Sequence, residues 1–191
     1  MPAAALLVLP AWVLGTFPSA QLVARARGVD VTSEGSGNPG ASNVARLLGW
    51  RYGLAVLAID FAKGAAAAGI GLWAGGRPGA YACGAAAVLG HTFPIWRKGG
   101  KGVATAGGML VVLFPVVVVA LGVVWFLVAQ VLKKASLASL LVIVAFPTLV
   151  AIAGYDRWEV AVLAGLAVLL VARHAANIRR LLRHEEIDLR S

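Results

Sequence analysis

Long apolar runs alternate with short polar segments along this chain. Crossing about 30 Å of hydrocarbon takes roughly 20 apolar residues in a helix, a length that several runs approach or exceed. The candidate runs lie at residues 3–24, 52–75, 80–96, 103–132, 135–154 and 158–172. The run at 103–132 is long for one crossing and short for two, so we expect a tight hairpin there, broken near Pro115 or Gly122.

The pattern therefore predicts an all-α, polytopic integral membrane protein with seven transmembrane helices in a single domain, residues 1–191. If the run at 103–132 crosses only once, the number is six and the last basic cluster lies on the other side of the membrane. The first run has neither a basic segment before it nor a clear small-residue cleavage site, so we interpret it as a retained helix, bent at Pro10 and Pro18. We expect a turn at residues 76–79 between the second and third runs, and loose order only in the tail after Arg183.

Composition supports a membrane location and argues against a nucleic-acid partner. Hydrophobic residues make up 60% of the chain and charged residues 13%, where soluble domains carry about a quarter. The net charge is +9, but the cations fall in short segments between the apolar runs. Four clusters hold most of them: Arg25, Arg27, Arg46 and Arg51; Arg97, Lys98 and Lys101; Lys133 and Lys134; Arg173, Arg179, Arg180, Arg183 and Arg190. If all four face the cytoplasm, the N-terminus is external and the C-terminus cytoplasmic.

The polar stretch GSGNPGASNVAR, residues 35–46, is unsuited to a regular helix. Its glycines, Gly37 among them, allow backbone conformations that present consecutive N–H groups. Such a nest suits a phosphate when polar and basic side chains lie beside it, here Ser36, Asn38, Asn43 and Arg46. The stretch is therefore a candidate anion site, with an ordinary interfacial loop as the alternative.

A second polar segment, GHTFPIWRKGGKGVAT, spans residues 90–105. Its core resembles a phosphate cradle that opens onto a helix N-terminus: Gly99, Gly100, Lys101 and Gly102. It is not a Walker A loop, because Ile95 stands where that pattern needs glycine and no Ser or Thr follows the lysine. We interpret Lys98 as a topology anchor at the membrane surface.

Two further groups of polar residues lie on predicted helices. In RHAANIRRLLRHEE, residues 173–186, His174 and Asn177 are three apart, so they share one helix face and can address one ligand. Within the second apolar run, Asp60 and Lys63 have the same spacing. Charges inside a membrane are costly, so we expect a structural ion pair there, with substrate handling as the alternative.

Several familiar catalytic patterns are missing from the sequence. No histidine begins a His-x4-Asp pattern, Gly-x-Ser-x-Gly does not occur, and no cluster of Cys and His has metal-ligand spacing. We therefore expect no metal, no cofactor and no covalent serine intermediate. Catalysis would depend on positioning two anionic reactants and on electrostatics, with at most one general base.

Taken together, the segments resemble the PlsY family, bacterial membrane acyltransferases that transfer a fatty acyl group from acyl phosphate to glycerol 3-phosphate. The family's GSGNxGxxNxxR motif matches residues 35–46, and its GHxFP and KGGKGVAT elements match 90–94 and 98–105. Its RHxxNIxRL stretch matches residues 173–181. The resemblance implies seven helices with three motif loops on the cytoplasmic side of the bacterial inner (plasma) membrane.

The resemblance also implies a role for each motif. Ser36 and Arg46, with Gly37, Asn38 and Asn43 of the same loop, would bind a substrate phosphate. The loop of Gly99, Gly100, Lys101 and Gly102 would hold the phosphate of glycerol 3-phosphate. His174 and Asn177 would orient the attacking hydroxyl, and Glu186 would match a structural carboxylate.

The sequence departs from the family pattern at two places. The segment between Pro94 and Lys98 is shorter than usual, and His184 replaces the glycine of the third motif.

The implied activity is an acyl-phosphate-dependent glycerol-3-phosphate 1-O-acyltransferase that yields lysophosphatidic acid and phosphate, the first step of phospholipid synthesis. Its partners would be glycerol 3-phosphate, acyl phosphate and membrane lipid, with no nucleic acid. The proton acceptor is either His174 or a substrate phosphate oxygen. Two alternatives stay open: a transporter for organic phosphates, and a non-catalytic binder. The sequence does not indicate an oligomeric state.

Overall fold

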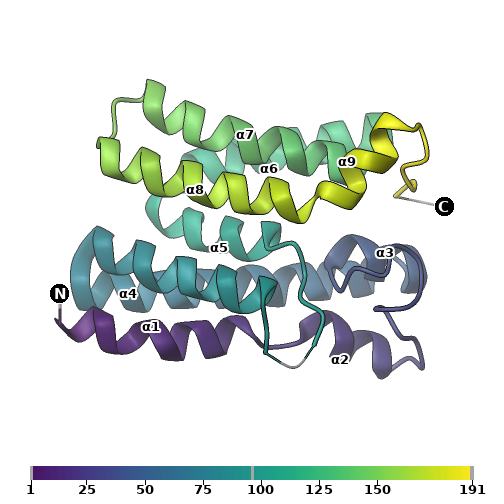
Figure 1. The fold of residues 1–191 in the computed structure, drawn as a ribbon, viewed down its shortest axis with the longest axis horizontal. Helices are drawn as coiled ribbons and strands as arrows, with labels where there is room; N and C mark the ends of the chain where they lie inside the picture. Colours follow the sequence, from purple (N-terminus) through teal and green to yellow (C-terminus); the bar gives the residue numbers. More distant parts are fainter. Residues whose placement is uncertain (1, 96, 190–191) are drawn as a thin grey trace. The chain divides into compact units, whose positions relative to one another are not determined.

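All regular structure in residues 2–95 and 97–189, the part of the chain that the computed structural model describes, is helical (Figure 1). This confirms the predicted all-α class. The helices in chain order are α1 (Pro2–Gly15), α2 (Ser19–Arg25), α3 (Ala41–Leu48), α4 (Trp50–Thr92), α5 (Val103–Leu113), α6 (Pro115–Leu132), α7 (Ala135–Ile152), α8 (Arg157–Arg173) and α9 (Ala175–Leu182).

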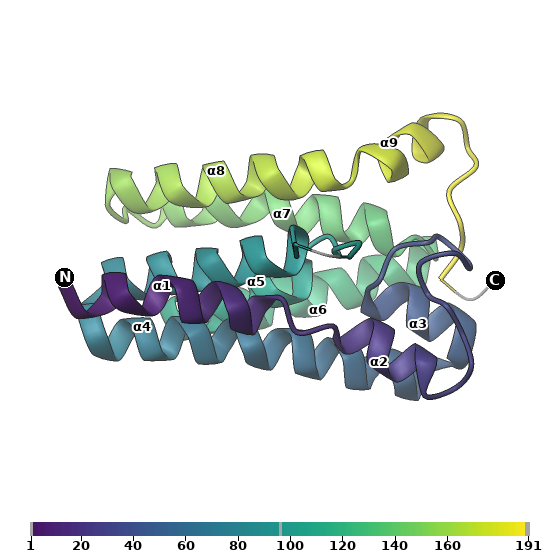
Figure 2. The ribbon, with the colours of Figure 1, turned by 60° about the horizontal axis from the view of Figure 1, so that its bottom comes forward.

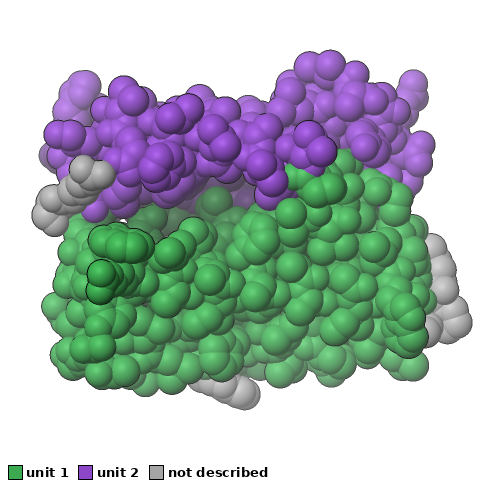
Figure 3. Space-filling model, turned by 180° about the vertical axis from the view of Figure 1, so that it is seen from behind, with its two compact units in different colours: residues 1–115 green, residues 116–191 purple. Residues whose placement is uncertain are grey.

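The chain divides into two compact units, Met1–Pro115 and Val116–Ser191, which Figure 3 colours separately. The boundary coincides with the break between α5 and α6. Phe114 leaves the helical conformation there, and α6 begins at Pro115, which has no backbone N–H to continue the preceding helix. The expected break of the run at 103–132 near Pro115 is thus confirmed, while the single domain stays a prediction.

The first predicted helix is divided rather than bent. α1 ends at Gly15 and α2 begins at Ser19, whereas Pro10 lies inside α1 without ending it. Pro18 explains the division, because its ring disfavours a helical conformation at the preceding residue. We call residues 16–18 the Pro18 corner; it turns the carbonyl groups of Thr16 and Phe17 toward other parts of the unit.

α4 is a hairpin of two helical limbs, residues 50–74 and 77–92. The backbone leaves the helical region at Gly75 and Gly76, where φ is −157° and 63°. A methyl group added at Gly71 would collide with the carbonyl oxygen of Gly79, so the limbs touch beside the turn. Figure 2 shows α1 running alongside them. The expected turn is confirmed, one residue earlier than predicted.

Small side chains allow the helices of the first unit to pack closely. One cluster joins α1 to both limbs of α4, through residues that include Ala11, Ala67 and Ala87. A second joins α2, α3 and the first limb, through Ala24, Val44 and others. These small side chains let the helix backbones approach closely. The polar loops at one end of the unit are therefore connected to tightly packed helices.

In the second unit, α6, α7 and α8 are followed by α9 and a tail whose residues form hydrogen bonds and ion pairs with the rest of the unit. Trp125 of α6 donates to the hydroxyl of Ser139 on α7 at 3.0 Å. In the tail, the N–H of Leu189 donates to the carbonyl of Lys133 at 2.8 Å, and Asp188 pairs with Lys134 at 2.5 Å. The expectation of loose order after Arg183 is therefore wrong for the described residues 184–189.

Several helices are long and apolar enough to cross a membrane. In the described ranges they are Ala4–Arg25, Trp50–Thr92, Pro115–Leu132 and Ala135–Ile152, with α8 and α9 as a fifth if this pair, bent by 59°, is one span. Trp50–Thr92 counts once although it is a hairpin, and α5 has only 11 residues. The chain is thus a multi-pass membrane protein, and the number of seven crossings stays a prediction.

Candidate active site

The expectation that residues 35–46 are unsuited to a regular helix is wrong for residues 41–46, because α3 begins at Ala41. The first glycine-rich loop, residues 35–40, is organised around one buried side chain, Asn43 in the first turn of α3. Its Oδ1 accepts the backbone N–H of Ser36 at 2.9 Å, and its Nδ2 donates to the carbonyls of Val31 and Glu34 at 3.1 and 3.0 Å. Asn43 is 2% exposed. Both N–H groups of its amide donate to backbone carbonyls, and its amide oxygen accepts a backbone N–H. Asn43 therefore supports the shape of the loop.

Glycine conformation completes this loop. Gly35 and Gly37 have φ of 59° and 64°, a region that other residues enter at a cost. The guanidinium of Arg46, one turn further along α3, donates to Asn43 Oδ1 at 3.2 Å. Ser36 and Arg46 are both half-buried and share Asn43 as a neighbour, so the loop presents a hydroxyl and a cation together.

The second loop connects α4 to α5 through Gly99, Gly100, Lys101 and Gly102. Gly102 is the N-cap of α5, with φ of 89°, and the N–H of Gly100 donates to the carbonyl of His91 at 3.1 Å. A side chain at Gly99 would collide with the carbonyl of Thr92. The loop thus leads into a helix N-terminus, whose N–H groups and dipole favour an anion, and Lys101 stands immediately before it.

The two loops lie against each other within the first unit. The ammonium of Lys98 would be 3.3 Å from a methyl group added at Gly37, and a methyl group at Gly100 would be 2.9 Å from the carbonyl oxygen of Pro39. The amide of Gln21 on α2 donates to the carbonyl of Lys98 at 3.0 Å. Lys98 therefore brings a cation to the first loop, a contact that our interpretation of it as a topology anchor missed.

A buried polar cluster lies beneath these loops. Asp60 and Lys63 form an ion pair, Oδ1 to Nζ 2.8 Å, with both side chains at most 3% exposed. The hydroxyl of Ser19 donates to Asp60 at 2.6 Å, and Nζ of Lys63 is 2.8 Å from Nδ1 of His91. The structure contains the predicted ion pair and adds Ser19 and His91, which sequence reasoning missed. The one feature of the sequence that pointed to His91 is its place in the GHTFP element, residues 90–94.

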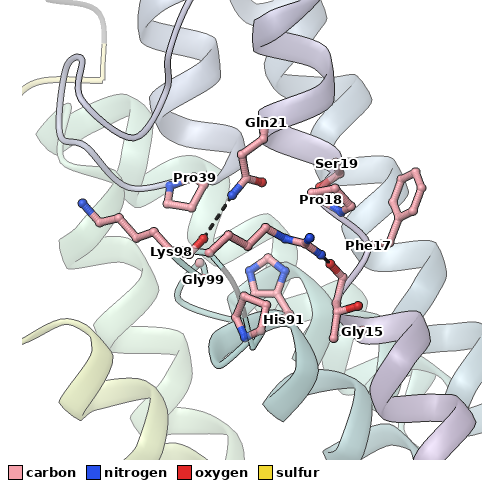
Figure 4. Close-up of a pocket in the computed structure, with 13 residues that line it drawn as sticks. Gly15, Phe17, Pro18, Ser19, Gln21, Pro39, His91, Lys98 and Gly99 are labelled. Atoms are coloured by element: carbon pink, nitrogen blue, oxygen red, sulfur yellow. Dashed lines mark hydrogen bonds between the residues drawn. The ribbon is translucent and has the colours of Figure 1, made fainter.

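A small hollow opens beside this cluster, between the Pro18 corner and the second loop. Figure 4 shows the His91 ring between that corner and the backbone of Lys98 and Gly99. The guanidinium of Arg97 donates to the carbonyl of Thr16 across the hollow. The backbone carbonyls that the broken first helix exposes are therefore used to bind basic side chains near the loops.

The third motif belongs to the second unit, where His174 lies at the junction of α8 and α9. The side chain is 1% exposed, and its Nδ1 is 2.8 Å from the carbonyl oxygen of Leu170. A carbonyl can only accept a hydrogen bond, so Nδ1 carries the proton and, in the neutral ring, Nε2 carries the lone pair. This tautomer is the one that a general base acting through Nε2 requires.

Asn177, one turn into α9, is held by a carboxylate. Its Nδ2 donates to Oε1 of Glu186 at 2.7 Å, and the same oxygen accepts the hydroxyl of Ser136 at 2.8 Å. Arg180 pairs with the other oxygen at 2.9 Å, and the ammonium of Lys134 donates to the backbone carbonyl of Glu186. The predicted structural role of Glu186 thus has a physical basis, because it ties α9 to the first turn of α7.

The charge state of Glu186 follows from these partners. Burial raises the pKa of its carboxyl group, but the hydrogen bonds from Asn177, Ser136 and Arg180, together with the charge of Arg180, outweigh burial and lower the pKa below its ordinary value. The carboxylate is therefore ionised at neutral pH.

Among the described residues, no group of three His, Cys, Asp or Glu side chains is arranged to hold a metal ion. The polar sites of the two units consist of glycine-rich backbone, amide and hydroxyl groups, and cations. The fold and these sites define the class as a multi-pass membrane protein with loops suited to anionic ligands.

Comparison with known proteins identifies the family. The chain matches the family model described as glycerol-3-phosphate acyltransferase over residues 5–184. It is 40% identical to the glycerol-3-phosphate acyltransferase of Sinorhizobium fredii over 187 residues, covering 95% of this chain and 90% of that protein. The Bacillus subtilis enzyme is 35% identical over 185 residues, with 95% of each chain covered.

Solved structures agree. The chain is similar to PlsY, an integral membrane glycerol 3-phosphate acyltransferase, in its glycerol 3-phosphate form (TM-score 0.92) and its lysophosphatidic acid form (TM-score 0.88). In both cases the sequences are 36% identical, and the match covers 97% of this chain and 94% of the other. The chain belongs to the glycerol-3-phosphate acyltransferase family of the PlsY type, as the resemblance predicted.

Proposed function

We propose that this acyltransferase transfers a fatty acyl group from acyl phosphate to the 1-hydroxyl of glycerol 3-phosphate. The products are 1-acyl-glycerol 3-phosphate, which is lysophosphatidic acid, and inorganic phosphate. The single observation that carries the proposal is the meeting of two glycine-rich loops in the first unit, with the Lys98 ammonium beside Gly37 and the carbonyl of Pro39 beside Gly100. Two phosphates with several negative charges need such a concentration of N–H groups and cations.

The reaction needs no covalent nucleophile on the enzyme, because the acyl donor is already activated. Acyl phosphate is a mixed anhydride, so phosphate is a good leaving group once its charge is neutralised. The 1-hydroxyl oxygen attacks the acyl carbonyl carbon, a new C–O ester bond forms, and the bond from the acyl carbon to the phosphate oxygen breaks. The hydroxyl proton passes to a base. Arg46 and Lys101, with the loop amides, reduce the repulsion between the two reactants.

We assign the individual roles as follows. Ser36 and Arg46, with Gly37 and Asn38, bind the phosphate of a substrate, while Asn43, whose amide is already used inside the loop, holds that loop in shape. The Gly99–Gly102 loop binds the phosphate of glycerol 3-phosphate. His174 and Asn177 orient the attacking hydroxyl, with Nε2 of His174 as its proton acceptor. The Nδ1 contact with Leu170 supports this choice of base over a substrate phosphate oxygen, because it leaves the lone pair on Nε2.

The proposal places the three motifs on the cytoplasmic side of the bacterial inner membrane, with the N-terminus external. The distribution of Lys and Arg supports this orientation. Cys83 is the one cysteine of the sequence, so its replacement by alanine leaves engineered cysteines as the only thiols. Single cysteines at positions 36 and 174, each in the Cys83→Ala background, should react only with reagents that reach the cytoplasmic side. Labelling of the two from opposite sides would exclude a shared set of substrates.

The assay that tests the function uses purified protein, glycerol 3-phosphate and palmitoyl phosphate, and measures lysophosphatidic acid and phosphate. Formation of both without a second compartment identifies the enzyme. Uptake of glycerol 3-phosphate into vesicles without acylation would identify a transporter instead, and binding without turnover a non-catalytic relative. A parallel reaction with a palmitoyl thioester tests the donor; equal rates would contradict the assignment of acyl phosphate.

A further inference from the structure

The buried cluster beneath the two loops fixes the orientation of His91. The ammonium of Lys63 has three N–H groups, and each has an acceptor: Oδ1 of Asp60 at 2.8 Å, the carbonyl of Phe17 at 3.2 Å and Nδ1 of His91 at 2.8 Å. An ammonium can only donate, so Nδ1 of His91 accepts and the ring proton lies on Nε2. Nδ1 is 3.6 Å from Asp60, which is beyond hydrogen-bond range.

The opposite edge of the ring supports the second glycine-rich loop. Any side chain at Gly100 would collide with Nε2 and Cε1 of His91, so the loop backbone packs directly on this edge. The N–H of Gly100 also donates to the backbone carbonyl of His91 at 3.1 Å. A change in the ring position would therefore move Gly100, which lies next to Lys101 and two residues before the N-cap of α5.

The cluster itself has little freedom to rearrange. Asp60 and Lys63 lie on one limb of α4, Ser19 begins α2, and Phe17 lies in the Pro18 corner. A buried ion pair whose remaining hydrogen bonds are also satisfied permits few alternative arrangements. The orientation of His91 is thus set by two separate chain segments, residues 17–19 and residues 60–63.

We propose that His91 is a positioning residue for the reaction. Lys63 holds its Nδ1, and its Nε2 edge sets the Gly99–Gly102 loop in the conformation that binds the phosphate of glycerol 3-phosphate. This inference rests on the proposed function, since it concerns the loop assigned to that substrate. The Asp60–Lys63 pair then has a functional role in addition to a stabilising one, because it orients His91.

Two substitutions test the roles of the two ring nitrogens of His91 separately. In His91→Asn the amide oxygen replaces Nδ1 but nothing replaces Nε2, so the cluster keeps its acceptor and the loop loses its support. We expect the KM for glycerol 3-phosphate to rise about tenfold, with kcat changed less than about threefold. In His91→Gln the amide nitrogen replaces Nε2, so KM should return toward the wild-type value while the melting temperature falls, because Lys63 loses an acceptor. His184→Asn, in the exposed tail, is the matched control.

Measuring the binding of glycerol 3-phosphate in the absence of an acyl donor tests the role of His91 independently of the proposed reaction. The glycerol 3-phosphate concentration that gives half of the maximal thermal shift should rise about tenfold in His91→Asn and stay unchanged in His184→Asn. If wild type binds glycerol 3-phosphate but forms no product, the proposed function fails and this result still decides the role of His91. Unchanged binding in His91→Asn would overturn the inference, as would wild-type protein that does not bind. Equal loss in the Asn and Gln variants, in step with their melting temperatures, would show a purely structural role.

Discussion

Asn43 accepts the backbone N–H of Ser36 at 2.9 Å, while the Ser36 hydroxyl takes no part in that contact. Among the described residues, the Ser36 hydroxyl accepts the N–H of Asn38 at 3.4 Å, near the limit for a hydrogen bond. The first loop is thus shaped through the main chain of Ser36, and its hydroxyl group is not needed to fold it.

Removal of the Ser36 hydroxyl or of the Arg46 side chain should therefore lower activity more than stability. We expect Ser36→Ala and Arg46→Ala each to reduce kcat/KM about 100-fold, the effect of losing one well-placed donor to a charged oxygen. Their melting temperatures should stay close to that of wild type. Initial rates at varied concentrations of both substrates, together with thermal unfolding in detergent, check this. Full activity in both variants would contradict the assignment of the loop.

His174 should contribute to turnover rather than to binding. If Nε2 accepts the hydroxyl proton, His174→Ala lowers kcat by about 10²- to 10⁴-fold at saturating substrate, the usual range for a general base. His174→Gln should be equally slow, because its amide nitrogen cannot accept a proton. Near-normal kcat in either variant would instead assign proton removal to a substrate phosphate oxygen.

Glu186 should make the stability of the protein depend on pH in the acidic range. Its pKa in the folded chain lies below the ordinary value of 4.5, because the hydrogen bonds of Asn177, Ser136 and Arg180 outweigh burial. A lowered pKa means that the carboxylate stabilises the folded chain above about pH 4.5, and that this contribution is lost as the pH falls through the folded pKa.

Glu186→Gln should therefore cost about 1–3 kcal/mol at neutral pH, with a smaller difference from wild type at pH 4 and below. Melting temperatures measured from pH 7 to pH 3.5 give this comparison. The neighbouring Glu185→Gln is the matched control, because that side chain is exposed, and it should follow wild type throughout. A constant difference between wild type and Glu186→Gln at all pH values would contradict the account.

His184 stands where the family pattern has glycine, and the structure gives the reason for that glycine. The residue has φ of 58°, in the left-handed region, immediately before the segment that carries Glu186. His184→Gly should raise the free energy of unfolding by about 1 kcal/mol, since the strain exceeds the extra freedom that glycine adds to the unfolded chain. Arg183→Gly, where φ is −94°, should lower it. Denaturation in mild detergent measures both, and a less stable His184→Gly would refute the argument.

The sequence was sufficient to predict the helical class, the breaks at Pro115 and near Gly76, and the three polar motifs. Each of these depends on nearby residues: the length of an apolar run, a proline that cannot continue a helix, or glycines close together. The resemblance to the PlsY family also depended on contiguous motifs, and the comparisons confirm it.

The contacts that organise the sites could not be predicted in this way, because they join distant positions. Ser19 and Asp60 are 41 residues apart, and Ser136 and Glu186 are 50 apart. Nothing near Ser19 indicates that its hydroxyl meets a buried carboxylate. The order of the tail has the same origin, since it depends on contacts with the start of α7 rather than on the composition of the tail itself.

The stoichiometry of the reaction tests the central claim most directly. Purified protein is mixed with glycerol 3-phosphate and palmitoyl phosphate, and lysophosphatidic acid and inorganic phosphate are measured over the same time course. Direct transfer from acyl phosphate predicts one phosphate released for each lysophosphatidic acid formed, with no phosphate release above background when glycerol 3-phosphate is omitted. Phosphate release without lysophosphatidic acid, or no release at all, would contradict the account.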